Sequence, residues 1–178
     1  MLKIGDVLDL GPLGARFAIK KTASDTDGES FDMEWELDPK TGGTPVHIHP
    51  HATESYEVLE GDFDVFVDGK WQTLSQGESA SVEAGIPHTF RNTSSSTTRV
   101  YNKHQPAQKF DEYFEGLSML VERGIITSDQ MTPKAILYLA VLMTTYKEEI
   151  VSVSPPDVIM KILGFIGRLF GYKISETV

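Results

Sequence analysis

The chain has 178 residues, with 16 basic against 26 acidic side chains and a formal charge of -10. It contains no cysteine, which excludes disulfide frameworks, thiolate zinc sites, iron–sulfur clusters and cysteine nucleophiles. The acidic excess argues against nucleic-acid binding, because that binding depends on lysine and arginine neutralising phosphates.

The first residues do not look like a secretory signal, since Asp6 and Asp9 interrupt the apolar pattern. The apolar run at 136–143 is far below the ~20 residues that a helix needs to cross a bilayer. We therefore expect a soluble, cytoplasmic protein that has no membrane partner.

The chain before Pro106 has the pattern of short β-strands separated by Gly, Asp, Asn and Pro. The clearest runs are 14–22, 30–37, 54–59, 63–67 and 99–104. The pair Asp68-Gly69 lies between 63–67 and 70–74 and predicts a hairpin, because both turn positions favour positive φ. Many short strands at this spacing predict an antiparallel sandwich or barrel over residues 1–105.

After Pro106 the hydrophobic period becomes helical, which predicts an extension of about three α-helices over residues 106–178. The first helix begins near Phe110 and ends at Gly124. Thr132-Pro133 supplies the N-cap and first residue of a second helix that runs to about Glu149. Pro155-Pro156 starts a third. Its apolar stripe consists of Val158, Ile162, Phe165, Ile166 and Leu169.

All five histidines lie between positions 47 and 104. In His47-Ile48-His49 the two imidazoles are two residues apart, so on an extended strand they point to the same face. Glu54 lies on the next strand and His88 much further along. Three imidazoles and a carboxylate suit zinc, iron, manganese, nickel or copper. A His-x-His pair by itself is better explained as two surface histidines that alternate by chance. The spacing of the surrounding residues therefore decides whether this pair belongs to a metal site.

That spacing resembles the two sequence motifs of the cupin superfamily. The first reads His47-Ile48-His49, four residues, Glu54, six residues, Gly61. Fifteen residues later the second begins. It runs Gly77, five residues, Glu83, one residue, Gly85, two residues, His88, three residues, Asn92. The resemblance covers roughly residues 40–104.

Two positions depart from the cupin pattern. Proline usually stands where this chain has Glu83, and the glycine expected before the first histidine is displaced to Gly42 and Gly43. Neither departure touches a ligand position.

The resemblance implies a mainly-β, double-stranded β-helix barrel, that of a small single-domain cupin of the quercetinase-like subgroup. It also implies that His47, His49, Glu54 and His88 bind one divalent transition metal. The helical extension then packs on the barrel or at a dimer interface, and a homodimer is expected.

Two functions are compatible with this resemblance. The first is a metal-dependent, oxygenase-like enzyme, an oxidoreductase acting on a small organic molecule, with Glu54 as ligand and catalytic proton acceptor. The alternative is a non-catalytic small-molecule binding or sensing module in which the metal is structural. This alternative is considered because the sequence shows no catalytic acid, base or nucleophile other than the four candidate ligands.

Other polar residues near the motifs have simpler expected roles. His51 follows the candidate ligand pair, but Pro50 bends the chain there. We therefore consider it less favoured that His51 lies at the mouth of the site. Glu57 has the opposite strand parity to Glu54 and is expected to be solvated or to support a ligand. For His104 a core or surface position is favoured over a catalytic one, and Asn92 is expected to hold a turn.

Overall fold

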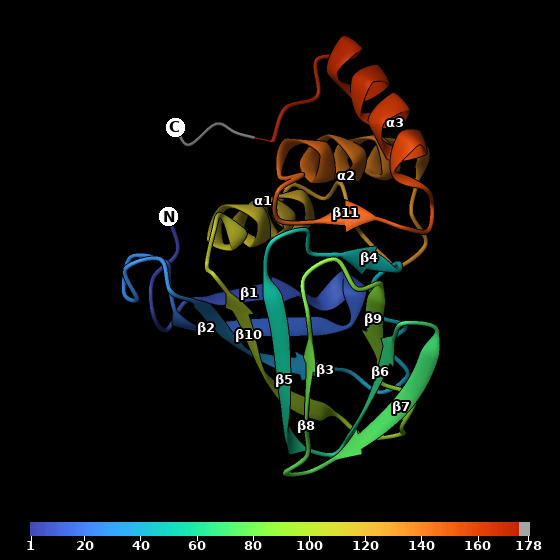
Figure 1. Cartoon of the computed structure of the whole chain (residues 1–178). Coiled ribbons are helices and arrows are strands. Elements are labelled where there is room, and N and C mark those ends of the chain that lie inside the picture. Colours follow the sequence, from blue (N-terminus) through green and yellow to red (C-terminus); the bar gives the residue numbers. More distant parts are fainter. Residues whose placement is uncertain (175–178) are drawn as a thin grey trace.

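Two antiparallel sheets face each other in the computed structural model, which describes residues 1–174 (Figure 1). The six-stranded sheet contains, in spatial order, β1 (Val7–Leu10), β2 (Ala15–Lys21), β3 (Phe31–Leu37), β10 (Thr98–Gln105), β5 (Thr53–Glu60) and β8 (Ser79–Val82). The five-stranded sheet contains β11 (Val151–Ser152), β4 (His47–Ile48), β9 (His88–Arg91), β6 (Asp62–Val67) and β7 (Lys70–Ser75). A 3₁₀ turn, η1 (Gly11–Leu13), joins β1 to β2. The fold is mainly β, as predicted.

Strand alternation builds the core between the sheets. In β3 the side chains of Phe31, Met33, Trp35 and Leu37 are each at most 2% exposed, because every second residue of a strand points to the same face. The Trp35 ring stacks on Phe17 from β2 at 4.9 Å between ring centroids. Full burial of such side chains contributes about 1.5–3 kcal/mol each.

Backbone conformation explains two features of the sequence. Asp68 and Gly69 have φ values of +46° and +85° and join β6 to β7, so the predicted hairpin is confirmed. Gly43 has a φ of +75°, and a Cβ atom at this position would lie 1.6 Å from the carbonyl oxygen of Phe90. The displaced glycine before the first histidine is therefore required for the chain to pass close to β9.

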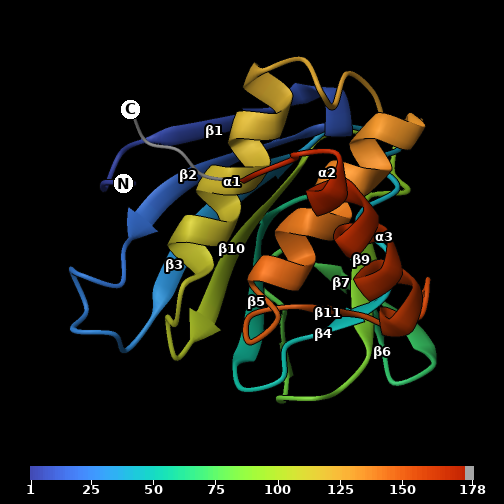
Figure 2. The ribbon, with the colours of Figure 1, turned by 90° about the horizontal axis from the view of Figure 1, so that it is seen from above.

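Three helices lie over one end of the two sheets, as the view from above shows (Figure 2). They are α1 (Phe110–Glu122), α2 (Pro133–Thr145) and α3 (Asp157–Leu169). The Thr132 hydroxyl accepts a hydrogen bond from the Ala135 amide at 3.1 Å, so the predicted N-cap of α2 is present. No helix in this part of the chain, up to residue 174, is long and apolar enough to cross a membrane.

The predicted end of the second helix, near Glu149, is wrong. The helix ends at Thr145, and a turn through residues 146–150 carries the chain back to the barrel. There β11 pairs with β4, with Val151 opposite Ile48 and Ser152 opposite His47 (Figure 1). The extension thus supplies a strand as well as helices. This strand has only two residues, so the sequence shows no periodic pattern that would predict it.

Candidate metal centre

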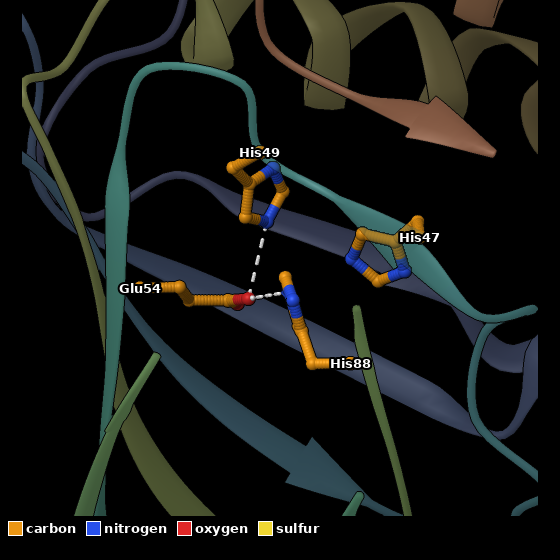
Figure 3. Close-up of side chains that lie close together, drawn as sticks. All are labelled: His47, His49, Glu54 and His88. Atoms are coloured by element: carbon orange, nitrogen blue, oxygen red, sulfur yellow. Dashed lines mark hydrogen bonds and ion pairs between the residues drawn. The ribbon is translucent and has the colours of Figure 1, made fainter. Parts of the chain in front are cut away.

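The four predicted ligand residues come from both sheets. His47 of β4 lies opposite His88 of β9 in the smaller sheet, and His49 follows two residues after His47. Glu54 lies near the start of β5 in the larger sheet. Figure 3 shows the four side chains pointing toward one another. One potential ligand atom from each lies within 4.8 Å of the others, so sequence reasoning selected residues that the fold does bring together.

The cluster is shielded from solvent. Each of its four residues is at most 5% exposed. A buried carboxylate and buried imidazoles are stable only when their polar atoms have partners. The hydrogen-bond partners of these imidazoles and of the carboxylate therefore indicate whether the cluster can bind a metal ion.

All three imidazoles have a carbonyl oxygen at Nδ1. His47 Nδ1 lies 2.9 Å from the Pro45 oxygen, and His88 Nδ1 lies 2.8 Å from the Ile86 oxygen. His49 Nδ1 lies 2.6 Å from the Glu149 oxygen. A carbonyl only accepts, so each Nδ1 donates its proton there, and Nε2 is the ring nitrogen that can bind a metal once it carries no proton. This is the tautomer that protein metal sites use, with a hydrogen-bonded partner behind each histidine.

The Glu54 carboxylate is held from two sides. Oε2 lies 3.1 Å from His49 Nε2 and 2.8 Å from His88 Nε2 (Figure 3). Oε1 accepts a hydrogen bond from Asn102 Nδ2 at 2.7 Å and lies 3.3 Å from His104 Nε2. One oxygen is thus fixed by β10, while the other faces the histidines.

Burial and the neighbouring charges set the protonation of the cluster. Burial opposes ionisation of Glu54, but His104 and the hydrogen bonds from His49 and His88 hold its pKa well below the ordinary value. Burial lowers the pKa of His47 well below that of a free imidazole. For His88 burial opposes the charge, yet the bond to Glu54 raises its pKa. The Glu54 charge therefore favours the protonated form of His88, and a cation bound among the four residues would take the place of that proton.

These observations fit a divalent transition metal. The donors are three imidazole nitrogens and one carboxylate oxygen, a set that suits borderline metals. Each Nδ1 already faces a carbonyl acceptor, as in metal-bound histidines, and the pKa of the Glu54 carboxyl group lies well below its ordinary value.

Two residues that sequence reasoning did not place at the site belong to its surroundings. Asn102 and His104 lie on the inner face of β10, opposite Tyr56 and Glu54 of β5. Burial lowers the pKa of His104. The shared parity of Val100, Asn102 and His104 is a signal for the inner face, but the register that sets His104 against Glu54 is not visible in the sequence.

The remaining candidates lie elsewhere. His51 is exposed, and its Nε2 pairs with Glu148 Oε2 at 3.0 Å. Glu57 is exposed, as expected. Asn92 is buried and holds a turn: its Oδ1 accepts from the Ser94 amide at 3.0 Å, and its Nδ2 donates to the Ser96 oxygen at 2.8 Å.

Comparison with known proteins gives a family match and partial relatives. The family model described as a cupin domain matches residues 33–102. The HTH-type transcriptional regulator PuuR of Escherichia coli (strain K12) is 28% identical over 101 residues, which cover 57% of this chain and 54% of the regulator. Quercetin 2,3-dioxygenase of Bacillus subtilis (strain 168) is 32% identical over 73 residues, 41% of this chain and 22% of the dioxygenase. The chain thus spans about half or less of the length of these relatives.

Solved structures share the fold. An RmlC-like cupin from Shewanella frigidimarina NCIMB 400 superposes with a TM-score of 0.52 at 22% identity, over 60% of this chain and 88% of that one. KdgF from Halomonas sp. gives a TM-score of 0.52 at 20% identity, over 60% of this chain and 92% of that one. At this identity the likeness shows the fold alone.

Proposed function

This chain contains a cupin domain, and we propose that the domain is a metal-dependent, oxygenase-like enzyme acting on a small organic molecule. His47, His49, Glu54 and His88 hold one divalent transition-metal ion, which is iron, manganese, nickel, copper or zinc. The observation that carries this proposal is the orientation of the imidazoles: each Nδ1 lies 2.6 to 2.9 Å from a backbone carbonyl oxygen, so Nε2 is the nitrogen that faces the cluster (Figure 3). When bound, such an ion supplies Lewis acidity to an organic group beside it.

Buried polar and aromatic groups on the inner face of the barrel favour an organic ligand next to the cluster. Tyr56 and Asn102 are opposite each other in register, and Trp35 packs against Tyr56 at 5.9 Å between ring centroids. The Tyr56 hydroxyl, the Trp35 Nε1 and the Asn102 Oδ1 are buried polar atoms that have no hydrogen-bond partner among residues 1–174. A small molecule that has aromatic surface and polar groups matches this combination.

Glu54 is the proposed proton acceptor. Its carboxylate is ionised, and Asn102 and His104 fix its position through Oε1. The region similar to this chain in quercetin 2,3-dioxygenase favours a dioxygenase reaction. In such a reaction both oxygen atoms of O₂ enter the organic product, so no external reductant is needed.

The test begins with metal analysis of the purified protein. We expect a stoichiometric divalent metal and a higher melting temperature when the ion is added to stripped protein. Oxygen uptake is then measured with catechols, flavonols and diketones after loading with each candidate metal. Protein that binds no metal and gains no thermal stability would overturn the proposal.

A sensing module is the second candidate. It is favoured by the 101-residue similarity to a transcriptional regulator and by the burial of all four cluster residues. In this case the ion stiffens the barrel, and a small molecule binds without turnover. Metal binding together with no oxygen uptake for any metal and substrate class would favour this function over the enzyme.

The proposed macromolecular partner is a second copy of the chain, which binds through α3. Gly164 and Gly167 bring one face of α3 close to α2, since Cβ atoms at these positions would lie 2.6 Å from Thr144 Oγ1 and 2.7 Å from Val141 Cγ2. The opposite face carries apolar side chains that are 43% to 71% exposed in the described chain: Val158, Ile159, Ile162, Phe165, Leu169 and Phe170.

The exposed area of this α3 face is close to what a dimer needs. With about 200 Å² for an aromatic side chain, the six residues expose on the order of 650 Å², and each partner in a standard-size interface buries ~800 Å². The formal charge of -10 disfavours an anionic membrane surface as the alternative occupant. Light scattering should give a dimer for the wild type and a monomer for Phe165→Asp. A concentration-independent wild-type monomer, or binding to phosphatidylserine vesicles through this face, would contradict the dimer.

A further inference from the structure

His49 differs from the other two cluster histidines in the origin of its hydrogen-bond partner. His47 and His88 each bind a carbonyl two residues earlier in the chain, at Pro45 and Ile86. The acceptor for each of these two Nδ1 atoms therefore comes from the local backbone. His49 binds the carbonyl of Glu149, which is 100 residues away and belongs to the C-terminal extension.

The segment that carries this carbonyl, residues 146–154, is attached directly to β4, the strand that contains His47 and leads into His49. Beyond the β11–β4 pairing, the amides of Val153 and Ser154 both donate to the Val46 oxygen, at 2.9 and 3.1 Å. Val46 immediately precedes His47. Any displacement of segment 146–154 thus acts on β4 and withdraws the acceptor from His49.

The first helix of the extension contacts the same histidine. The Phe110 ring lies 5.0 Å from the His49 ring and 4.0 Å from the His104 ring between centroids, and it is fully buried. The Lys109 amide, at the N-cap of α1, donates to Glu149 Oε1 at 3.3 Å. Glu149 therefore joins α1 through its side chain and His49 through its backbone.

We infer that segment 146–154 is part of the metal site: it positions His49, so metal binding and docking of this segment stabilise each other. The inference rests on the proposed metal binding. The carbonyl behind a metal-binding histidine fixes the tautomer and ring orientation, and loss of such a partner lowers metal affinity about 10-fold to 100-fold. Because equilibrium coupling is reciprocal, the ion must strengthen docking by the same factor.

The experiment compares Val153→Pro with Val153→Ala in the full chain. Proline removes the amide that donates to Val46, whereas alanine keeps it, and the Val153 side chain is 40% exposed. Zn²⁺ affinity is measured by calorimetry, and Co²⁺ binding by visible absorption, which reports the ligand geometry. We expect Val153→Pro to weaken Zn²⁺ binding about 10-fold to 100-fold and to change the Co²⁺ spectrum. Val153→Ala should stay within about twofold of the wild type.

A merely structural role for the segment predicts a different result. In that case Val153→Pro lowers the melting temperature of metal-free protein but leaves the Zn²⁺ affinity and the Co²⁺ spectrum unchanged, which would overturn the inference. If the wild-type chain binds neither Zn²⁺ nor Co²⁺, the proposed metal-dependent function is wrong, and the inference that rests on it is wrong as well.

Hydrogen exchange on the unmodified protein tests the reciprocal effect and needs no variant. Zn²⁺ should slow exchange of the Lys109 amide, which donates to Glu149, and of the Val153 and Ser154 amides, which donate to Val46. Protection confined to the barrel strands, with no change at these three amides, would refute the coupling even if Val153→Pro fails to fold.

Discussion

Replacement of Asn102 by leucine removes the hydrogen bond that holds Glu54 but keeps a side chain packed in the barrel. It therefore tests what this hydrogen bond contributes to stability and to metal binding. Asn102 is fully buried, and its Nδ2 donates to Glu54 Oε1 at 2.7 Å. Leucine keeps the branching and the number of side-chain heavy atoms, so the intended change is the loss of a hydrogen bond to a buried charge. Such bonds contribute about 1.5–3 kcal/mol. We therefore expect the free energy of unfolding of metal-free protein to fall by about 2 kcal/mol.

The same substitution should weaken metal binding. Glu54 Oε1 would keep His104 Nε2 at 3.3 Å but lose its shorter bond to Asn102, so the carboxylate would be held less firmly, and the metal Kd should rise about 10-fold or more. The assays are urea unfolding in the presence of a chelator and calorimetric titration with Zn²⁺. Val100→Ala is the matched control. Val100 is a buried inner-face position two residues earlier on β10, where stability should fall without a large change in Kd.

The result that would refute this reasoning is specific. If Asn102→Leu unfolds within about 0.5 kcal/mol of the wild type, a range typical of neutral surface substitutions, and binds Zn²⁺ equally well, Asn102 does not support the carboxylate. A loss of stability with unchanged Kd would show that the bond serves the fold and not the metal.

Three further predictions concern single residues. His49→Ala should abolish metal retention, measured by metal analysis, while circular dichroism stays that of the wild type; retained affinity would contradict its role as a ligand. Thr73, Thr93 and Arg91 lower the pKa of Asp64 despite its burial, so its contribution to stability is present above the unfolded pKa of about 3.9 and is lost as the pH falls through the lower folded value. Asp64→Asn should accordingly cost about 1–2 kcal/mol at pH 7, with the difference shrinking toward pH 3 in urea unfolding, and a pH-independent difference would argue against the shift. Gly43→Ala should destabilise the fold by more than about 3 kcal/mol, because positive φ and a clash with backbone act together; a near-normal melting temperature would show that the 42–46 loop can move away from β9.

The cluster residues were predictable because their relation is largely local. The parity of His47 and His49 follows from the twofold repeat of an extended strand. The spacing to Glu54 and His88 resembles that of a family motif, and the cupin-domain model matches residues 33–102. The Asp68-Gly69 hairpin and the Thr132 cap are local in the same sense, since a few neighbouring residues determine each. These features need no knowledge of how distant segments meet.

The support of the cluster was decided by tertiary structure alone. His104 and Asn102 reach Glu54 only through the register of β10 on β5, and His49 obtains its acceptor from Glu149 only because the chain turns back after α2. A strand register depends on all the contacts along both strands, and a backbone carbonyl is present at every residue whatever its side chain. For that reason the sequence by itself determined which side chains gather, whereas the folded chain decided which groups hold them and that the extension takes part.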